Sequence, residues 1–168
     1  MVWSLVGRDT SGALFDSILL LEQEQGRRRN PFINAGALVT TDELLAGRAP
    51  KDALSEIIGF LRAASGDDDI HIDAAVAASE RATGYRNIAL ANYLKSYDNL
   101  KNDPDKVLGT YFHQCAIEMT TEQLALAGRC IAGLPGSPLL LPPVKRRRIS
   151  ALMMTCGNYD GSGDFALR

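Results

Sequence analysis

The sequence predicts a mainly helical globular domain with strands confined to its two ends. A chain of 168 residues suits one domain, and a 46% hydrophobic composition is enough to form a core. In the middle of the chain, apolar residues recur with helical spacing between capping residues. The opening "VWSLVG" is typical of a strand edge or a turn, and the closing "GSGDFALR" of a strand that is just beginning. A compact domain seldom begins and ends inside its elements, so we expect residues 1–168 to form a single domain that is incomplete at both ends.

The first half of the chain predicts three helices. Residues 14–24 are dense in apolar side chains and should form a short buried helix that ends at Gly26. Asn30 is a suitable N-cap for the next helix, with Pro31 at its first position. In residues 51–64 the apolar positions follow the i, i+3, i+4, i+7 pattern of an amphipathic helix.

The second half predicts further helices that are separated by clear signals. An alanine-rich segment should end near Gly84, and a helix should resume directly after it. Later helices begin at Asp103 as N-cap and at the Thr120 and Gln123 capping-box pair, and the last helix stops at Gly157. The expected ranges are 72–84, 85–97, 103–119, 120–133 and 143–157.

Composition and charge exclude several classes of protein. The net charge of -2 argues against a dedicated nucleic-acid binder. No apolar run approaches the ~20 residues that span a bilayer, and the first residues lack the pattern of a secretory signal. The three cysteines are an odd number and widely spaced, so we expect reduced, buried thiols in a cytoplasmic protein without membrane contact.

Common catalytic and metal motifs are missing from the sequence. It has no phosphate-binding GxxxxGK[ST] loop, no GxGxxG, no CxxC pair and no HExxH. Its two histidines, His71 and His113, are too few for a multi-histidine metal site, and none of the ten serines has a lysine three residues later. These absences rule out a multi-histidine metal site, and no serine of this chain has a usual activating partner.

Five polar residues lie where packing alone would not place them. Asn34 interrupts the apolar run "INAGALV", although a buried unpaired amide costs roughly 1–3 kcal/mol. Glu80 and Asn87 are about two helical turns apart and would share a face if the helix continues past Gly84. Tyr111 lies on an apolar helix face, and Tyr159 follows the Gly157 stop in a glycine-flanked loop. Each has an ordinary structural explanation alone, but together they indicate a site.

Several blocks of the sequence resemble the serine-dependent glutaminase family. They are "GRDTSGALFDSILLLEQEQG", "NPFINAGALV", "SERATGYRNIALANYL", "YFHQCAIEM" and "RRRISALMMTCGNYDGSGDFALR", in the family's order and over essentially the whole chain. The resemblance implies hydrolysis of L-glutamine to L-glutamate and ammonia without a cofactor, and a homo-oligomeric assembly. It implies an α/β fold of the β-lactamase and transpeptidase type, of which this chain would form mainly the helical subdomain with edges of the sheet subdomain.

The resemblance also implies roles for the five polar residues. Asn34, Asn87 and Tyr111 match positions that line the family's substrate pocket. Glu80 matches a carboxylate that can pair with the α-ammonium group of glutamine. Tyr159 matches a phenol that both binds the substrate and can relay a proton near the nucleophile, which makes it the one candidate catalytic residue of this chain.

The family's Ser-x-x-Lys nucleophile and base, and its Lys-Ser-Gly-Val-Gly-Gly block, have no counterpart here. We therefore expect the 168 residues to be inactive alone. An alternative is a non-catalytic module that binds glutamine or another protein. A weaker alternative interprets "KRRRIS" as a phosphorylation motif at Ser150, although these residues are also typical of a solvated helix face.

Overall fold

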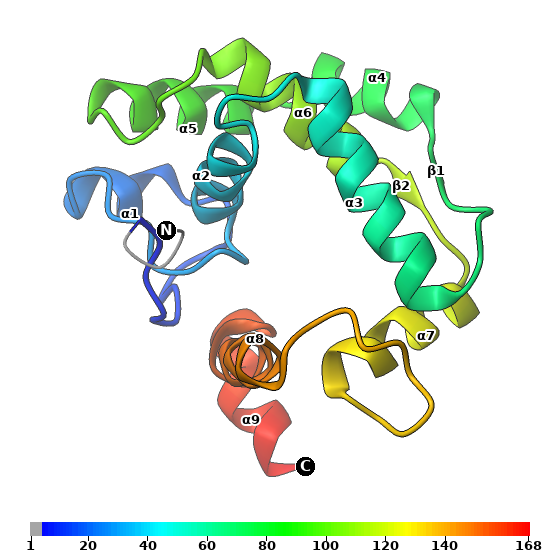
Figure 1. The fold of residues 1–168 in the computed structure, drawn as a ribbon. Helices are drawn as coiled ribbons and strands as arrows, with labels where there is room; N and C mark the ends of the chain where they lie inside the picture. The colour runs from blue at the N-terminus through cyan, green and yellow to red at the C-terminus, as the bar shows by residue number, and fades with distance from the viewer. Residues whose placement is uncertain (1–4) are drawn as a thin grey trace.

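Helices dominate the computed structural model, which describes residues 5–168 (Figure 1). Short connections join most of them, and a 3-10 turn at Tyr159–Gly161 precedes the last. The helices are α1 (Ile18–Gln23), α2 (Asn34–Leu44), α3 (Pro50–Ser65), α4 (Ala74–Thr83), α5 (Tyr85–Ser96), α6 (Pro104–Cys115), α7 (Thr121–Ala132), α8 (Pro143–Cys156) and α9 (Ser162–Leu167). The expectation of a mainly helical unit is confirmed.

The main core lies where α2, α5 and α6 pack against one another, in the upper part of Figure 1. Apolar side chains three or four residues apart on each helix meet there, as expected for faces of period 3.6. The completely or almost completely buried residues of these helices include Leu38, Val39, Leu90, Leu94, Val107 and Phe112. This core fixes the relative positions of the helix ends that carry the candidate site.

A second, smaller core joins α3 to α7 around Ala64, Ala127 and Cys130. Beside it, the two-residue strands β1 (His71–Ile72) and β2 (Ile117–Glu118) form an antiparallel pair, with His71 opposite Glu118. The prediction that strands lie only at the ends of the chain was therefore wrong. Two residues are too few to show the apolar alternation by which a strand is recognised.

The two ends of the chain compare differently with expectation. Residues 2–4 of the opening segment, predicted as a strand edge or a turn, lie outside the described residues, and Leu5 and Val6 form a turn. The closing segment, predicted as a beginning strand, is helix α9. Among the described residues no strand lies beside this segment, and a helix satisfies its backbone hydrogen bonds internally.

Most predicted helix boundaries are confirmed by their caps. Asp103 accepts a hydrogen bond from the Asp105 backbone N–H, and Thr120 and Gln123 form a complete capping box. Asn30, by contrast, does not cap a helix that starts at residue 31. Its side-chain oxygen accepts from the N–H groups of Phe32 and Ile33, which holds a turn, and α2 begins only at Asn34.

Two further expectations concern surfaces. In the described part of the chain, no helix has the length and apolar character required to cross a bilayer. Ser150 lies within α8 and is only half exposed, while Lys145, Arg147 and Arg148 before it are exposed. These features favour the solvated helix face over a phosphorylation motif.

Candidate functional site

The five candidate polar residues come from five different elements. Asn34 begins α2, Glu80 lies in α4, Asn87 lies in the first turn of α5, Tyr111 lies in α6, and Tyr159 begins the 3-10 turn. The structure joins the two asparagines directly and places Glu80 and Tyr159 close enough to Tyr111 to raise the pKa of its phenol. Their roles in binding and catalysis are inferred from the family resemblance.

The side-chain amide of Asn34 forms a hydrogen bond with another side-chain amide. Its Nδ2 donates to Oδ1 of Asn87 at 2.8 Å, and its backbone N–H donates to the carbonyl of Phe15 at 2.9 Å. This pairing uses one donor of Asn34 and one acceptor site of Asn87. It leaves the Asn34 Oδ1 and the Asn87 amino group to bind a ligand, so the pair offers an acceptor beside a donor.

The glycine of the "INAGA" block explains why α2 can begin where it does. A Cβ atom at Gly36 would lie only 1.8 Å from the carbonyl oxygen of Asn30. Asn30 is buried, and its Nδ2 donates to the Asp9 carbonyl at 2.8 Å. The Asn30 turn and the first turn of α2 are therefore in direct backbone contact, and this contact sets the position of Asn34.

The helix end predicted near Gly84 is confirmed, so the condition under which Glu80 and Asn87 would share one helix face is not met. The helix ends at Thr83, and Gly84 serves as both the C-cap of α4 and the N-cap of α5. A Cβ atom at Gly84 would lie 2.7 Å from the Phe112 ring, so the glycine lets this junction pack closely onto α6. Both polar residues remain half-buried beside that junction.

Tyr111 lies in a desolvated environment. Burial is the main cause that raises the pKa of its phenol above the ordinary value, followed by its neighbour Cys115. The charges of Glu80 and Tyr159 contribute smaller increases to this pKa. The phenol therefore stays protonated at neutral pH and can act as a hydrogen-bond donor, and the same interactions show that Glu80 and Tyr159 are close to it.

Tyr159 is held in an unusual backbone conformation. Its φ of 49° lies in the left-handed region, which costs a non-glycine residue of order 1–2 kcal/mol. Its ring stacks on Phe15, with ring centroids 5.3 Å apart. Ser162 Oγ donates to its carbonyl at 2.8 Å. The surrounding contacts thus offset the strain and direct the phenol toward the other candidate residues.

Phe15 is a residue of the site that the sequence did not indicate. Its carbonyl accepts from Asn34, and its ring stacks on Tyr159, so it links the two ends of the site. The neighbouring Gly12 N–H donates to Asp160 Oδ1 at 3.0 Å, which fixes the same segment to the Tyr159 turn. We had expected Phe15 in a buried helix, but α1 begins only at Ile18 and Phe15 is 45% exposed.

All three cysteines were expected to be buried, but Cys115 is exposed at the end of α6, and it provides a probe of the geometry. Burial raises the pKa of its thiol, hydrogen bonding with Tyr111 lowers it, and the charge of Glu80 raises it. Near pH 8, below the ordinary thiol pKa of about 8.5, a raised pKa means less thiolate and slow alkylation. We predict that Glu80→Gln speeds iodoacetamide labelling of Cys115 by roughly twofold or more, because the substitution removes one of the charges that raise the pKa of the thiol.

Mass spectrometry of the labelled protein measures this rate, since Cys130 and Cys156 are fully buried and should react far more slowly. Glu122→Gln is the matched control, because Glu122 is exposed and lies in the first turn of α7. Equal labelling rates in both variants would show that Glu80 does not act on the thiol.

The arrangement suits recognition of a small zwitterion. Glu80 can pair with an ammonium group, and the Asn87 amino group can donate to a carboxylate. Two phenols border these polar groups. Within residues 5–168, no three His, Cys, Asp or Glu side chains gather closely enough to hold a metal ion.

Comparisons of the whole chain with known proteins point to one family. The model of the glutaminase family matches residues 1–168. A glutaminase of Mesorhizobium japonicum is 55% identical to the chain, over 99% of this chain and 54% of that protein. A glutaminase of Rhizobium etli is 53% identical, over 98% of this chain and 55% of that protein. The chain thus spans about half the length of the curated relatives that it matches.

Solved structures of similar proteins share the fold. A probable glutaminase of Bacillus subtilis superposes with a TM-score of 0.89 at 35% identity, over 99% of this chain and 54% of that one. A Bacillus glutaminase studied in 4.3 M NaCl gives a TM-score of 0.90 at 35% identity, over 99% of this chain and 57% of that one. The expected fold, mainly the helical subdomain of a β-lactamase-like protein, is confirmed.

Proposed function

This chain belongs to the glutaminase family, and on that premise we propose that it supplies the substrate-binding side of an active site that hydrolyses L-glutamine to L-glutamate and ammonia. The observation that carries the proposal is the hydrogen bond between Asn34 and Asn87. It leaves an acceptor and a donor free, and together with the Glu80 carboxylate these are the groups that an α-amino acid requires.

In this proposal the two ends of glutamine are bound by different groups. Glu80 pairs with the α-ammonium group, and the unused Asn34 Oδ1 accepts a second hydrogen bond from it. The Asn87 amino group donates to the α-carboxylate. Charge-assisted hydrogen bonds of this kind contribute roughly 1.5–3 kcal/mol each, so Glu80 should dominate the affinity.

Tyr111 and Tyr159 act on the side-chain end of the substrate. The Tyr111 phenol, kept protonated by its raised pKa, forms a wall that can donate a hydrogen bond. We assign to Tyr159 the relay of a proton during acyl transfer, which its strained and well-anchored position supports. In the family mechanism the attacking serine and its lysine base come from a Ser-x-x-Lys block, which these 168 residues do not contain.

A chimeric enzyme tests this function. The region of the Mesorhizobium japonicum glutaminase that matches this chain is replaced by these 168 residues, and ammonia release from glutamine is measured. The chimera should be active. Asn34→Ala should lower kcat/KM by roughly tenfold or more, the cost of losing one well-placed hydrogen bond and unpairing Asn87.

The matched control is Asn92→Ala, because Asn92 is exposed on α5 and bonds only to the carbonyl of Ile88 among the described residues. An active chimera in which both variants behave alike would contradict the role of Asn34. The 168 residues alone should release no ammonia above background. If they released ammonia at the rate of the relatives, our assignment of the nucleophile and base to residues outside this sequence would be overturned.

A non-catalytic module is the second candidate, favoured by the lack of a Ser-x-x-Lys pair in a chain that keeps the recognition residues. Glutamine binding without ammonia release, together with an inactive chimera, would support it. For either function we propose a homo-oligomer, as the family resemblance implies, in the cytoplasm. The three cysteines, which are all free, support the cytoplasmic location.

A further inference from the structure

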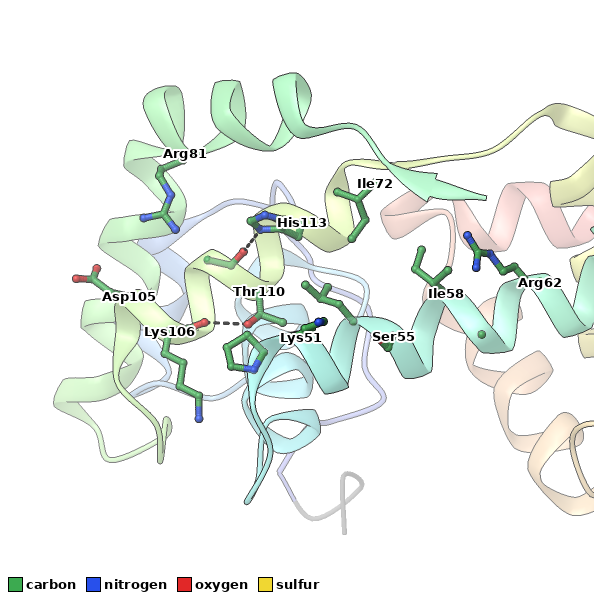
Figure 2. Close-up of a pocket in the computed structure, with 14 residues that line it drawn as sticks. Lys51, Ser55, Ile58, Arg62, Ile72, Arg81, Asp105, Lys106, Thr110 and His113 are labelled. Carbon is green, nitrogen blue, oxygen red and sulfur yellow. Dashed lines mark hydrogen bonds between the residues drawn. The ribbon is translucent and has the colours of Figure 1, made fainter. Parts of the chain in front are cut away.

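A groove of about 630 Å³ lies between α3 and α6 and extends to α4 and β1 (Figure 2). It is lined by basic side chains from three helices. Lys51 and Arg62 come from α3, Arg81 from α4, and Lys106 and His113 from α6. None of these residues belongs to the candidate glutamine site.

The charges in the groove are strongly unbalanced. Asp105 is the one acidic residue that lines it, against four lysine and arginine side chains. Within residues 5–168, neither Lys51, Arg81 nor Lys106 has a carboxylate oxygen within 4.0 Å. Lys106 Nζ does donate to Asn102 Oδ1 at 3.0 Å, but this partner carries no charge. Grouped cations without acidic partners repel one another, so an anion in the groove would relieve an unfavourable arrangement.

Several of these donors are already held in place. Arg62 donates from Nε and Nη2 to the carbonyl of Ile70, at 3.1 and 2.7 Å, which fixes its guanidinium. Arg81 extends from α4 over α6, where its Nη2 would lie 2.9 Å from a Cβ atom at Gly109. His113 Nδ1 donates to the Gly109 carbonyl at 2.6 Å, so its Nε2 remains for another partner.

The rest of the groove is apolar. Leu54, Ile58 and Ile72 are half-buried along it, and Figure 2 shows Ile58 and Ile72 facing one another between Arg62 and His113. Gly59 and Gly109 leave room beside them. A ligand that fits would therefore combine a charged headgroup with an apolar body.

We propose that this groove binds a small organic anion that carries a carboxylate or a phosphate monoester. The headgroup lies near Arg81, with Lys51 and Lys106 contributing positive charge, and the apolar body covers Ile58 and Ile72. Because Tyr111 and His113 are two residues apart on α6, they face different sides of that helix. The groove is thus separate from the glutamine site, and the proposal does not depend on the proposed function.

Isothermal titration of the 168-residue protein tests the proposal with four probes. Phenyl phosphate and phenylacetate carry the two headgroups on an apolar ring, phenol lacks the charge, and inorganic phosphate lacks the ring. We expect binding of at least one ring-bearing anion, and weaker binding of phenol and inorganic phosphate. Whichever anion binds more tightly identifies the headgroup, and binding of neither would overturn the proposal.

Variants locate the binding. Arg81→Gln should weaken the binding of the better anion by roughly fivefold, as expected for a partly exposed charge pair. Arg147→Gln removes the same charge from an exposed position on α8 and should have no effect. If both variants weakened binding equally, the anion would be attracted non-specifically to the net charge, and the proposal would be overturned. Unchanged binding to Arg81→Gln would overturn it as well.

Discussion

Replacing Gly36 by alanine should destabilise the protein by about 3 kcal/mol or more, a large effect for one methyl group. The added Cβ would lie 1.8 Å from the Asn30 carbonyl oxygen and 3.0 Å from the Pro31 Cα atom. The Asn30 turn cannot move freely, because its side chain is buried and bonds to Asp9, Phe32 and Ile33. Urea unfolding of the variant and the parent measures the difference.

Gly59→Ala is the matched control for this prediction. Gly59 lies inside α3, and a Cβ atom there would meet nothing within 4 Å. Alanine is the better helix former by about 1 kcal/mol, so this variant should be slightly more stable than the parent. If Gly36→Ala were equally stable, the contact between the Asn30 turn and α2 would not exist as described.

Replacing Glu80 by glutamine should weaken glutamine binding by roughly 10–100-fold, the largest effect that we expect on the site. The substitution keeps the size of the side chain but removes the charge that pairs with the α-ammonium group. The measurement is a glutamine titration of the 168-residue protein, monitored by calorimetry.

Glu122→Gln serves again as the control, since it makes the same chemical change at an exposed position. Its affinity for glutamine should equal that of the parent. An unchanged affinity in Glu80→Gln would show that the carboxylate takes no part in the recognition of glutamine. This conclusion would hold even if the labelling experiment shows that Glu80 acts on the Cys115 thiol.

Local signals in the sequence predicted most of the helices correctly. Asp103 and the Thr120–Gln123 pair are caps whose hydrogen bonds join residues two or three apart, so the sequence contains both partners. The amphipathic pattern of residues 51–64 likewise predicted almost the full length of α3. Interactions of this range can be predicted from one sequence.

Contacts between distant segments could not be predicted in the same way. Asn30 looked like a helix cap, but its role depends on Asp9 and on the close approach of Gly36. The β1–β2 pair joins His71 to Glu118 across three helices, α4, α5 and α6, and its strands have too few residues to show a pattern. Phe15 acquires its role only when the Tyr159 turn packs on it.

The candidate site was predicted as a set of residues rather than as a geometry. The family resemblance named Asn34, Glu80, Asn87, Tyr111 and Tyr159, and the structure brings the asparagines into contact and places Glu80 and Tyr159 near Tyr111. Glu80 and Asn87 do not share one helix, because the helix ends near Gly84 as the sequence predicted. The close packing of Gly84 on Phe112, by contrast, cannot be predicted from helical spacing.

The most direct test of glutamine recognition is a titration observed through the side-chain amide groups by 15N NMR. As glutamine is added to the 168-residue protein, the signals of Asn34 and Asn87 should shift together and saturate at the same concentration, while the signal of exposed Asn92 stays in place. If Asn34 and Asn87 do not respond, or if Asn92 shifts as much as they do, this chain does not bind glutamine through the amide pair.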